Sequence, residues 1–163
     1  FVTCRALHVN YLLDVGPKSD GSLEDEVYTN MTIVAHWMAA NGESVHGITP
    51  LPTGEEASVP ATARSKSADS PSAEERYLFA LPRFKSEQGD EDNMNHVYPE
   101  DILPPQNVAL SLTNGLGNPT AVFLLRDGSK LHFVCSNNVT TVQLPASKRT
   151  DLVDVVKLEY PAR

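Results

Sequence analysis

The order of a strand, a tight turn and a helix near the start of the chain restricts the fold more than any other feature. An apolar pattern over residues 9–15 runs into Gly16-Pro17, and a long helical pattern follows over residues 23–40. This order forms half of a βα unit, whose strand needs parallel neighbours to pair its backbone groups. Residues 1–7 predict the end of a helix rather than such a neighbour, so we expect the partner strands to come from elsewhere.

The helix predicted over residues 23–40 has marked ends and a single apolar stripe. Ser22 suits an N-cap, acidic residues at 24–26 lie at the positive end of the helix dipole, and Gly42 provides a stop. At about 100° per residue the apolar side chains share a narrow arc, which predicts one face on a sheet and the other in water. The residues of that arc are Leu23, Val27, Met31, Val34 and Met38.

The composition changes after residue 48 and again after residue 76. Residues 49–76 are rich in Pro, Ser, Thr, Ala and Glu and predict a connector, in which a short strand near Ala61–Arg64 is possible. Residues 77–163 predict an antiparallel β-sandwich with a solvated insertion over Ser86–Asp101. The predicted strands are 77–81, 107–113, 120–126, 130–135, 139–144 and 154–160.

Turn signals separate these strands. Asp127-Gly128 suits a two-residue type I′ hairpin, whose twist matches that of the flanking strands. Alternation after this turn places Leu131, Phe133 and Cys135 on one face of the next strand. Asn114-Gly115 and Asn137-Asn138 predict further turns, and together these signals indicate an antiparallel meander.

The first third of the chain resembles the last strand and last helix of the catalytic barrel in family 29 glycoside hydrolases, the α-L-fucosidases. That family has a segment of the form Asn-hydrophobic-Leu-Leu-Asn-Ile-Gly-Pro-x-x-Asp-Gly before a helix that ends in Trp-Leu-x-x-Asn-Gly-Glu. Asp14 departs from this pattern, because the family usually has Asn at that position. The matching residues here are Asn10, Tyr11, Leu12, Leu13, Val15, Gly16, Pro17, Asp20, Gly21, Trp37, Met38, Asn41, Gly42 and Glu43.

The resemblance implies a fold for each part of the chain. Residues 1–48 would form the terminal βα unit of a (β/α)8 barrel, residues 49–76 a connector, and residues 77–163 a C-terminal antiparallel β-sandwich. Such a barrel alone takes about 250 residues, so the 163 residues are expected to be the C-terminal segment of a larger enzyme. The upstream barrel portion of the same enzyme is then the expected partner.

The activity that the resemblance implies is the retaining hydrolysis of terminal α-L-fucosides, with a fucosylated glycan as the substrate of the complete protein. It places the catalytic carboxylates and the fucose-binding histidines upstream of Phe1. No catalytic or substrate-binding residue is therefore assigned here, and the isolated segment is expected to be inactive. Asp14 lies near the end of a barrel strand, where active sites form, but we expect it to hold the following turn.

A non-catalytic carbohydrate-binding or interaction sandwich is the alternative function. Faces that bind sugars stack aromatic rings against the pyranose, and the tail carries no Trp and no row of aromatic residues. This composition favours scaffolding over sugar recognition. The aromatic residues considered, which the pattern places in the core or in loops, are Phe79, Phe84, Tyr98, Phe133 and Tyr160.

Charge and residue spacing argue against several other functions. A net charge of −8 without clustered Lys and Arg disfavours nucleic acid, and no apolar run is long enough to span a membrane. His8, His36, His46, His96 and His132 lack metal-ligand spacing, so we expect no metal and no cofactor. The acidic run Asp90–Asp92 is predicted to be solvated, and Gly115-Leu-Gly117 a turn rather than a phosphate loop.

Two glycosylation sequons suggest a compartment. Asn30-Met-Thr32 lies beside the apolar arc of the helix, where a glycan would compete with packing, whereas Asn138-Val-Thr140 lies in a turn between strands and is the better candidate. If they are used, the protein is extracellular or lysosomal. Cys4 and Cys135 are expected to be free thiols.

Overall fold

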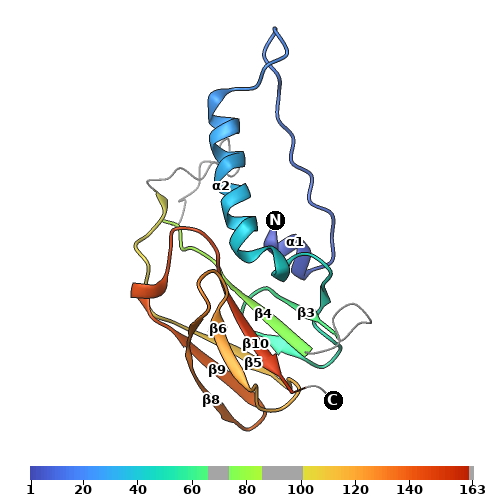
Figure 1. Cartoon of the computed structure of the whole chain (residues 1–163), viewed down its shortest axis with the longest axis vertical. Coiled ribbons are helices and arrows are strands. Elements are labelled where there is room, and N and C mark those ends of the chain that lie inside the picture. The colour runs from blue at the N-terminus through green and yellow to red at the C-terminus, as the bar shows by residue number, and fades with distance from the viewer. Residues whose placement is uncertain (66–73, 86–100, 162–163) are drawn as a thin grey trace.

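Two antiparallel sheets form the larger part of the protein, as a computed structural model that describes residues 1–65, 74–85 and 101–161 shows (Figure 1). In sheet A the order is β1 (Thr49–Pro50), β3 (Ala61–Arg64), β4 (Glu74–Ala80), β10 (Asp154–Tyr160), β6 (Ala121–Leu124) and β7 (Ser129–Lys130). In sheet B the order is β2 (Glu56–Ala57), β5 (Val108–Thr113), β9 (Val139–Leu144) and β8 (His132–Ser136). The predicted antiparallel β-sandwich is confirmed.

Alternation along the strands of sheet A produces two separate cores. Leu78 of β4 and Leu158 of β10 face sheet B and are fully buried between the sheets. Their neighbours Phe79 and Val155 face the opposite side, where α1 and the C-terminal part of α2 cover them. Since successive side chains of a strand point to opposite faces, β4 and β10 serve both cores, and sheet A is the central layer of the molecule.

Two helices and an extended segment form the N-terminal part. The helix α1 (Val2–Ala6) is followed by an extended segment that runs out beside α2 (Asp25–Asn41) and turns back at residues 18–21 (Figure 1). The predicted strand over residues 9–15 is extended but pairs with no other strand in the described ranges. The reason is that the described residues supply no parallel strand beside this segment, as expected from the sequence.

The ends of α2 differ in detail from the prediction. The N-cap is Glu24, and Ser22 instead donates hydrogen bonds from its backbone N and its Oγ to Oδ1 of Asp20. Gly42 is at the predicted C-cap, but it keeps a right-handed φ of −58° because the chain continues into the short 3-10 helix η1 (Gly42–Ser44). The position of the stop was predictable, whereas its geometry depends on the packing of η1.

The strands predicted within residues 77–163 are present with ends that differ by a few residues, except that the range 130–135 is divided between β7 of sheet A and β8 of sheet B. The range 49–76, predicted as a connector, also contributes β1, β2 and β3, so it is part of both sheets rather than a plain loop. The division of the chain at residues 48 and 76 stays a prediction. The predicted insertion over Ser86–Asp101 lies outside the described residues except for Asp101.

The predicted type I′ hairpin at Asp127-Gly128 is wrong. Leu124 pairs with Ser129, so the loop has four residues, and Gly128 donates from N to the Leu124 carbonyl at 2.9 Å. Of these four loop residues only Gly128 has a positive φ, at +67°. Asp127 accepts a hydrogen bond from the Ser129 N–H instead, which stabilises a longer turn. The turns predicted at Asn114 and Asn137-Asn138 are confirmed, each with a positive φ.

Candidate functional site

An apolar groove lies between α2, the extended segment and the loop before β10. It has a volume of about 690 Å³, and we call it the α2 groove. Several of its side chains remain open to solvent, among them Leu13, which is 55% exposed, and Val34, which is 52% exposed. The lining residues are Phe1, Val2, Tyr11, Leu13, Val15, Val27, Asn30, Met31, Ile33, Val34, Trp37, Met38, Leu152 and Val153.

The sequence pattern explains both long walls of the groove. Val27, Met31 and Val34 recur at helical spacing, which places them on one face of α2 as predicted. The alternate residues Tyr11, Leu13 and Val15 of the extended segment face the same space. Leu12 points elsewhere and is 89% exposed. The extended segment thus has one continuous apolar face, toward α2, while its other face carries Leu12 between the polar residues Asn10 and Asp14.

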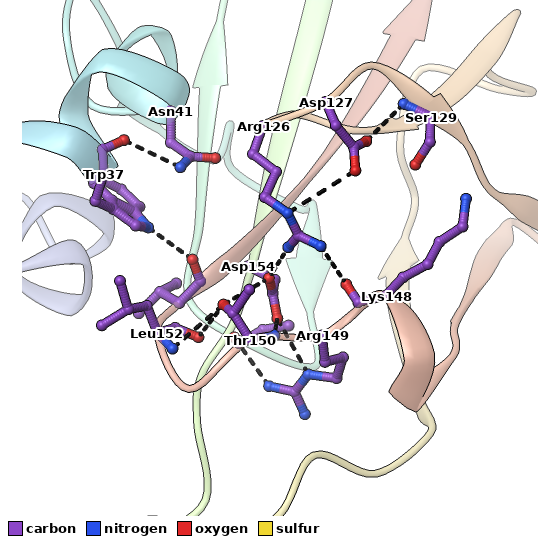
Figure 2. A network of polar contacts seen from close by, with 12 residues as sticks. Trp37, Asn41, Arg126, Asp127, Ser129, Lys148, Arg149, Thr150, Leu152 and Asp154 are labelled. Carbon is purple, nitrogen blue, oxygen red and sulfur yellow. Dashed lines mark hydrogen bonds and ion pairs between the residues drawn. The ribbon is translucent and has the colours of Figure 1, made fainter. Parts of the chain in front are cut away.

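The inner end of the groove is attached to the sandwich through Trp37. Its indole Nε1 donates a hydrogen bond of 2.7 Å to the Val153 carbonyl, as Figure 2 shows. The ring also packs against the outer core of sheet A, beside Phe79 and Val155. A buried indole N–H needs an acceptor, and the chain supplies one 116 positions later in the sequence.

A polar network next to this contact is centred on Asp154 (Figure 2). The buried carboxylate accepts hydrogen bonds from the Thr150 backbone N at 3.0 Å, from Thr150 Oγ1 at 3.1 Å and from Arg149 Nε at 3.4 Å. Arg126 Nη1 forms a further close ion pair with it. A buried carboxylate needs such partners to offset its desolvation. We call Arg126, Arg149, Thr150 and Asp154 the Asp154 network.

A second charged group on the outer face of sheet A attaches η1. The Lys157 ammonium lies 2.9 Å from a Glu75 oxygen and 3.1 Å from oxygens of both Glu43 and Glu159. Burial by itself lowers the pKa of Lys157, but the hydrogen bonds to these three carboxylates outweigh it and raise the pKa above its ordinary value. Lys157 therefore stays charged and links β10 to η1.

The neighbouring acid and phenol have shifted pKa values for related reasons. Burial alone raises the pKa of Glu75, yet the hydrogen bonds from Tyr77 and Lys157 and the charges of Lys157 and Arg64 bring it below the ordinary value. Burial and the bond to Glu75 raise the pKa of Tyr77 well above its ordinary range. Glu75 is thus ionised and paired, and Tyr77 protonated, so this group does not offer the pair of a free acid and a free base that general acid–base catalysis requires.

Asp14 does not have the structural role that we expected. Its side chain is exposed, and it forms no hydrogen bond with the described part of the chain. The turn is held by Asp20, whose Oδ1 accepts from Ser22 N at 2.9 Å and from Ser22 Oγ at 2.7 Å. The Ser22 hydroxyl and then its N–H lower the pKa of Asp20. The triplet Asp20-Gly21-Ser22 was the signal for this turn, since Asp side chains bond the backbone two residues on.

The two predicted glycosylation acceptors have different surroundings. Asn30 is exposed and lines the α2 groove, in agreement with its expected position beside the apolar arc. Asn138 is exposed in the turn between β8 and β9, with a φ of +62°. Neither modification is tested by these positions, and both stay predictions.

Other candidate residues are not brought together. His8, His36, His46 and His132 are exposed on different segments, and Cys4 and Cys135 are free thiols. Among the described residues, no three His, Cys, Asp or Glu side chains are placed to hold a metal ion. None of the helices in these ranges is long and apolar enough to cross a membrane. His96, Tyr98 and Asp90–Asp92 lie outside the described residues.

Comparison with known proteins connects this fold to one group of enzymes. No protein-family model matches the chain. The α-L-fucosidase of Dictyostelium discoideum is 35% identical to it over 49 residues, which are 30% of this chain and 11% of that protein.

Solved structures of α-L-fucosidases match nearly the whole chain. Isoenzyme 1 from Paenibacillus thiaminolyticus has a TM-score of 0.64 at 19% identity, over 97% of this chain and 32% of that one. A family 29 enzyme from Bacteroides thetaiotaomicron has a TM-score of 0.62 at 19% identity, over 96% and 30%. The Thermotoga maritima enzyme has a TM-score of 0.58 at 14% identity, over 96% and 32%. The predicted resemblance is confirmed, and the chain spans about a third of the length of these structures.

Proposed function

We propose that this chain is the C-terminal part of an α-L-fucosidase-like glycoside hydrolase, in which residues 1–48 complete a (β/α)8 barrel. The complete protein hydrolyses terminal α-L-fucosides with retention of configuration, and fucosylated glycans are its substrates. Its catalytic carboxylates belong to polypeptide upstream of Phe1, and it works outside the cell or in the lysosome. The shared fold and the 49-residue match to an α-L-fucosidase support this proposal.

The uncovered extended segment is the observation that carries the proposal. Its backbone has no strand partner in the described ranges, and it has an apolar face of Tyr11, Leu13 and Val15 toward α2, with the exposed Leu12 on the opposite face. An extended segment of this kind is stable when neighbouring strands pair with its backbone and a second layer covers its apolar face. Upstream barrel strands would pair with this segment, and the barrel would fill the α2 groove.

The sandwich has the role of a scaffold in this proposal. Its outer face binds α1, η1 and the end of α2, and it thereby holds the terminal βα unit in place. A sugar-binding sandwich would expose a row of aromatic rings. Among its described residues only Phe84 is an exposed aromatic, at 43%, while Phe133 is half-buried and Phe79 and Tyr160 are buried. Scaffolding is therefore favoured over carbohydrate binding.

The first experiment assays the purified chain on an aryl α-L-fucoside. We expect no turnover, because none of the charged groups described above forms a free pair of carboxylates. Appreciable hydrolysis by the 163-residue chain would overturn the proposal that the catalytic residues lie upstream.

The second experiment supplies the missing part with a chimera, in which this chain replaces the corresponding segment of the Dictyostelium discoideum α-L-fucosidase. We expect fucosidase activity that Val34→Asp abolishes, since a charge in the α2 groove would be buried against the barrel. Val134→Asp is the matched control, because Val134 is 55% exposed on β8, outside the groove, and Val34 is 52% exposed. Equal activities of the two variants would contradict the assigned interface.

A further inference from the structure

We propose that Asp154 is the positioning residue of the α2 groove. Through the loop at residues 149–153 it sets the position of the Val153 carbonyl and of the Leu152 side chain, and so fixes the angle at which α2 leaves the sandwich. This role depends on contacts within the chain and is independent of the proposed activity.

The carboxylate of Asp154 joins the loop to the framework of sheet A. Its two hydrogen bonds from Thr150 close residues 150–154 into a tight loop (Figure 2). Arg149 also donates a hydrogen bond of 2.7 Å from Nη2 to the carbonyl of Leu81, which lies just after β4. Arg126, which lies just after β6, donates from Nη2 to the Lys148 carbonyl at 2.9 Å. The loop is therefore attached to the ends of both strands that flank β10.

The loop then meets α2 at a single polar contact. Val153 accepts the hydrogen bond from Trp37 Nε1, and Leu152 and Val153 both line the α2 groove. The Trp37 carbonyl also accepts from Asn41 Nδ2 at 3.1 Å, so the last turn of the helix is tied to the same point. Toward its N-terminus α2 projects away from the sandwich (Figure 1). The direction of the helix is thus set near Trp37.

Helix geometry shows why a small change here matters. At about 1.5 Å per residue, Asp25 lies about 18 Å along the axis from Trp37. A tilt of about 10° at Trp37 therefore displaces the start of α2 by about 3 Å. The extended segment that forms the other wall enters α2 at that end, so the width of the groove follows the tilt.

The test compares two acidic residues that contact the same arginine. Asp154 is buried and bonds the loop, whereas Asp127 is half-exposed, lies 3.9 Å from Arg126 and makes no contact with the loop at 149–153. Asp127→Asn is the matched control, because an Asn carbonyl can still accept the hydrogen bond from Ser129 N. Trp37 is the only tryptophan of the 163 residues, so intrinsic fluorescence reports on the contact with Val153.

We measure the emission maximum, the acrylamide quenching constant and the far-UV circular dichroism of the 163-residue chain. Asp154→Asn is expected to shift the emission of Trp37 to the red and to raise the quenching constant, with the β-sheet signal retained. Asp127→Asn is expected to change neither quantity. A folded Asp154→Asn protein with unchanged Trp37 emission and quenching overturns the proposal, as does an equal change in Asp127→Asn.

Thr150→Val decides the question if Asp154→Asn does not fold. This variant keeps the carboxylate paired with both arginines and removes the hydroxyl that closes the loop, with its bond of 3.1 Å to Asp154 and its contacts with the Leu152 carbonyl at 3.4 Å and the Leu152 N–H at 3.3 Å. We expect a smaller red shift in the same direction. Unchanged emission and quenching in Thr150→Val overturns the positioning role.

Discussion

The interior of the sandwich and the α2 groove are built from the same kinds of side chain and differ in what covers them. Leu110 and Leu158 of the interior are fully buried because each sheet covers the other. Leu13 and Val34 of the groove have a wall on one side and solvent on the other. Apolar patterning therefore indicates which face a residue occupies, while burial requires a second layer. The groove is one half of a core.

The largest expected effect on stability distinguishes the sandwich interior from the α2 groove. Leu158→Ala should lower the free energy of unfolding by about 2–5 kcal/mol, because it leaves a cavity between the closed sheets. Val34→Ala should cost at most about 0.5 kcal/mol, since Val34 has no second layer to lose. Urea denaturation of both variants gives the comparison. Similar losses would mean that the groove is as well covered as the sandwich interior.

The next largest effect on stability is expected at a charged pair buried in the sandwich. Arg76 is buried at one end of the sandwich, and Glu55 binds it in a bidentate manner, with N···O distances of 2.6 and 2.7 Å. Glu55→Gln should cost about 2 kcal/mol, because it removes charge-assisted hydrogen bonds from a buried guanidinium. The exposed neighbour Glu56 supplies the control, and Glu56→Gln should leave the urea midpoint unchanged. A loss that is the same in both variants would show that burial of the pair is unimportant.

A pH titration tests the charged group around Lys157 on the outer face of sheet A, the layer between the sandwich interior and the α2 groove. Glu75 has a lowered pKa in the folded protein, so its contribution to stability is present above its ordinary value of 4.5 and is lost as the pH falls through the folded pKa. The decrease in thermal stability below pH 4.5 should be shallower in Glu75→Gln than in the parent chain. Identical profiles would show that the pairing of Glu75 with Lys157 and Tyr77 does not contribute to the pH dependence of stability.

The smallest effect is expected at Asp14, an exposed residue of the extended segment that forms one wall of the α2 groove. Asp14→Asn should change the free energy of unfolding by less than about 0.5 kcal/mol, because the side chain is exposed and has no hydrogen bond in the described part of the chain. Differential scanning calorimetry measures the change, with Asp20→Ala as the variant that does disturb the turn, because it removes the acceptor of both hydrogen bonds from Ser22. A loss above about 1 kcal/mol at Asp14 would show that it has a structural role after all.

The sandwich could be predicted from local patterns because its strands alternate and pair within the chain. The strands near Leu78, Val142 and Leu158 follow from period-two alternation, and the positive φ at Asn114 and Asn138 follows from turn composition. β1 and β2 have only two residues each, too few to show any period. Their pairing is decided by the neighbouring strand rather than by their own sequence.

The candidate site was only partly predictable. The apolar arc of α2 identified Val27, Met31 and Val34 as one face, and the groove uses that face. The Asp154 network and the Trp37 contact could not be foreseen, because they join residues up to 116 positions apart and have no local period. The error at Asp14 arose because it lies at the end of the predicted strand, whereas the turn that follows contains Asp20, whose spacing to Ser22 permits the hydrogen bonds.

The central place of β10 has a consequence for synthesis on the ribosome. β10 lies between β4 and β6, although it is the last strand of the described chain. Trp37 leaves the ribosome 116 residues before its acceptor Val153. At about 5–20 residues per second, this delay is roughly 6–23 seconds. During that time α2 has no finished sandwich surface to dock on, so it joins the sandwich only after β10 has been translated.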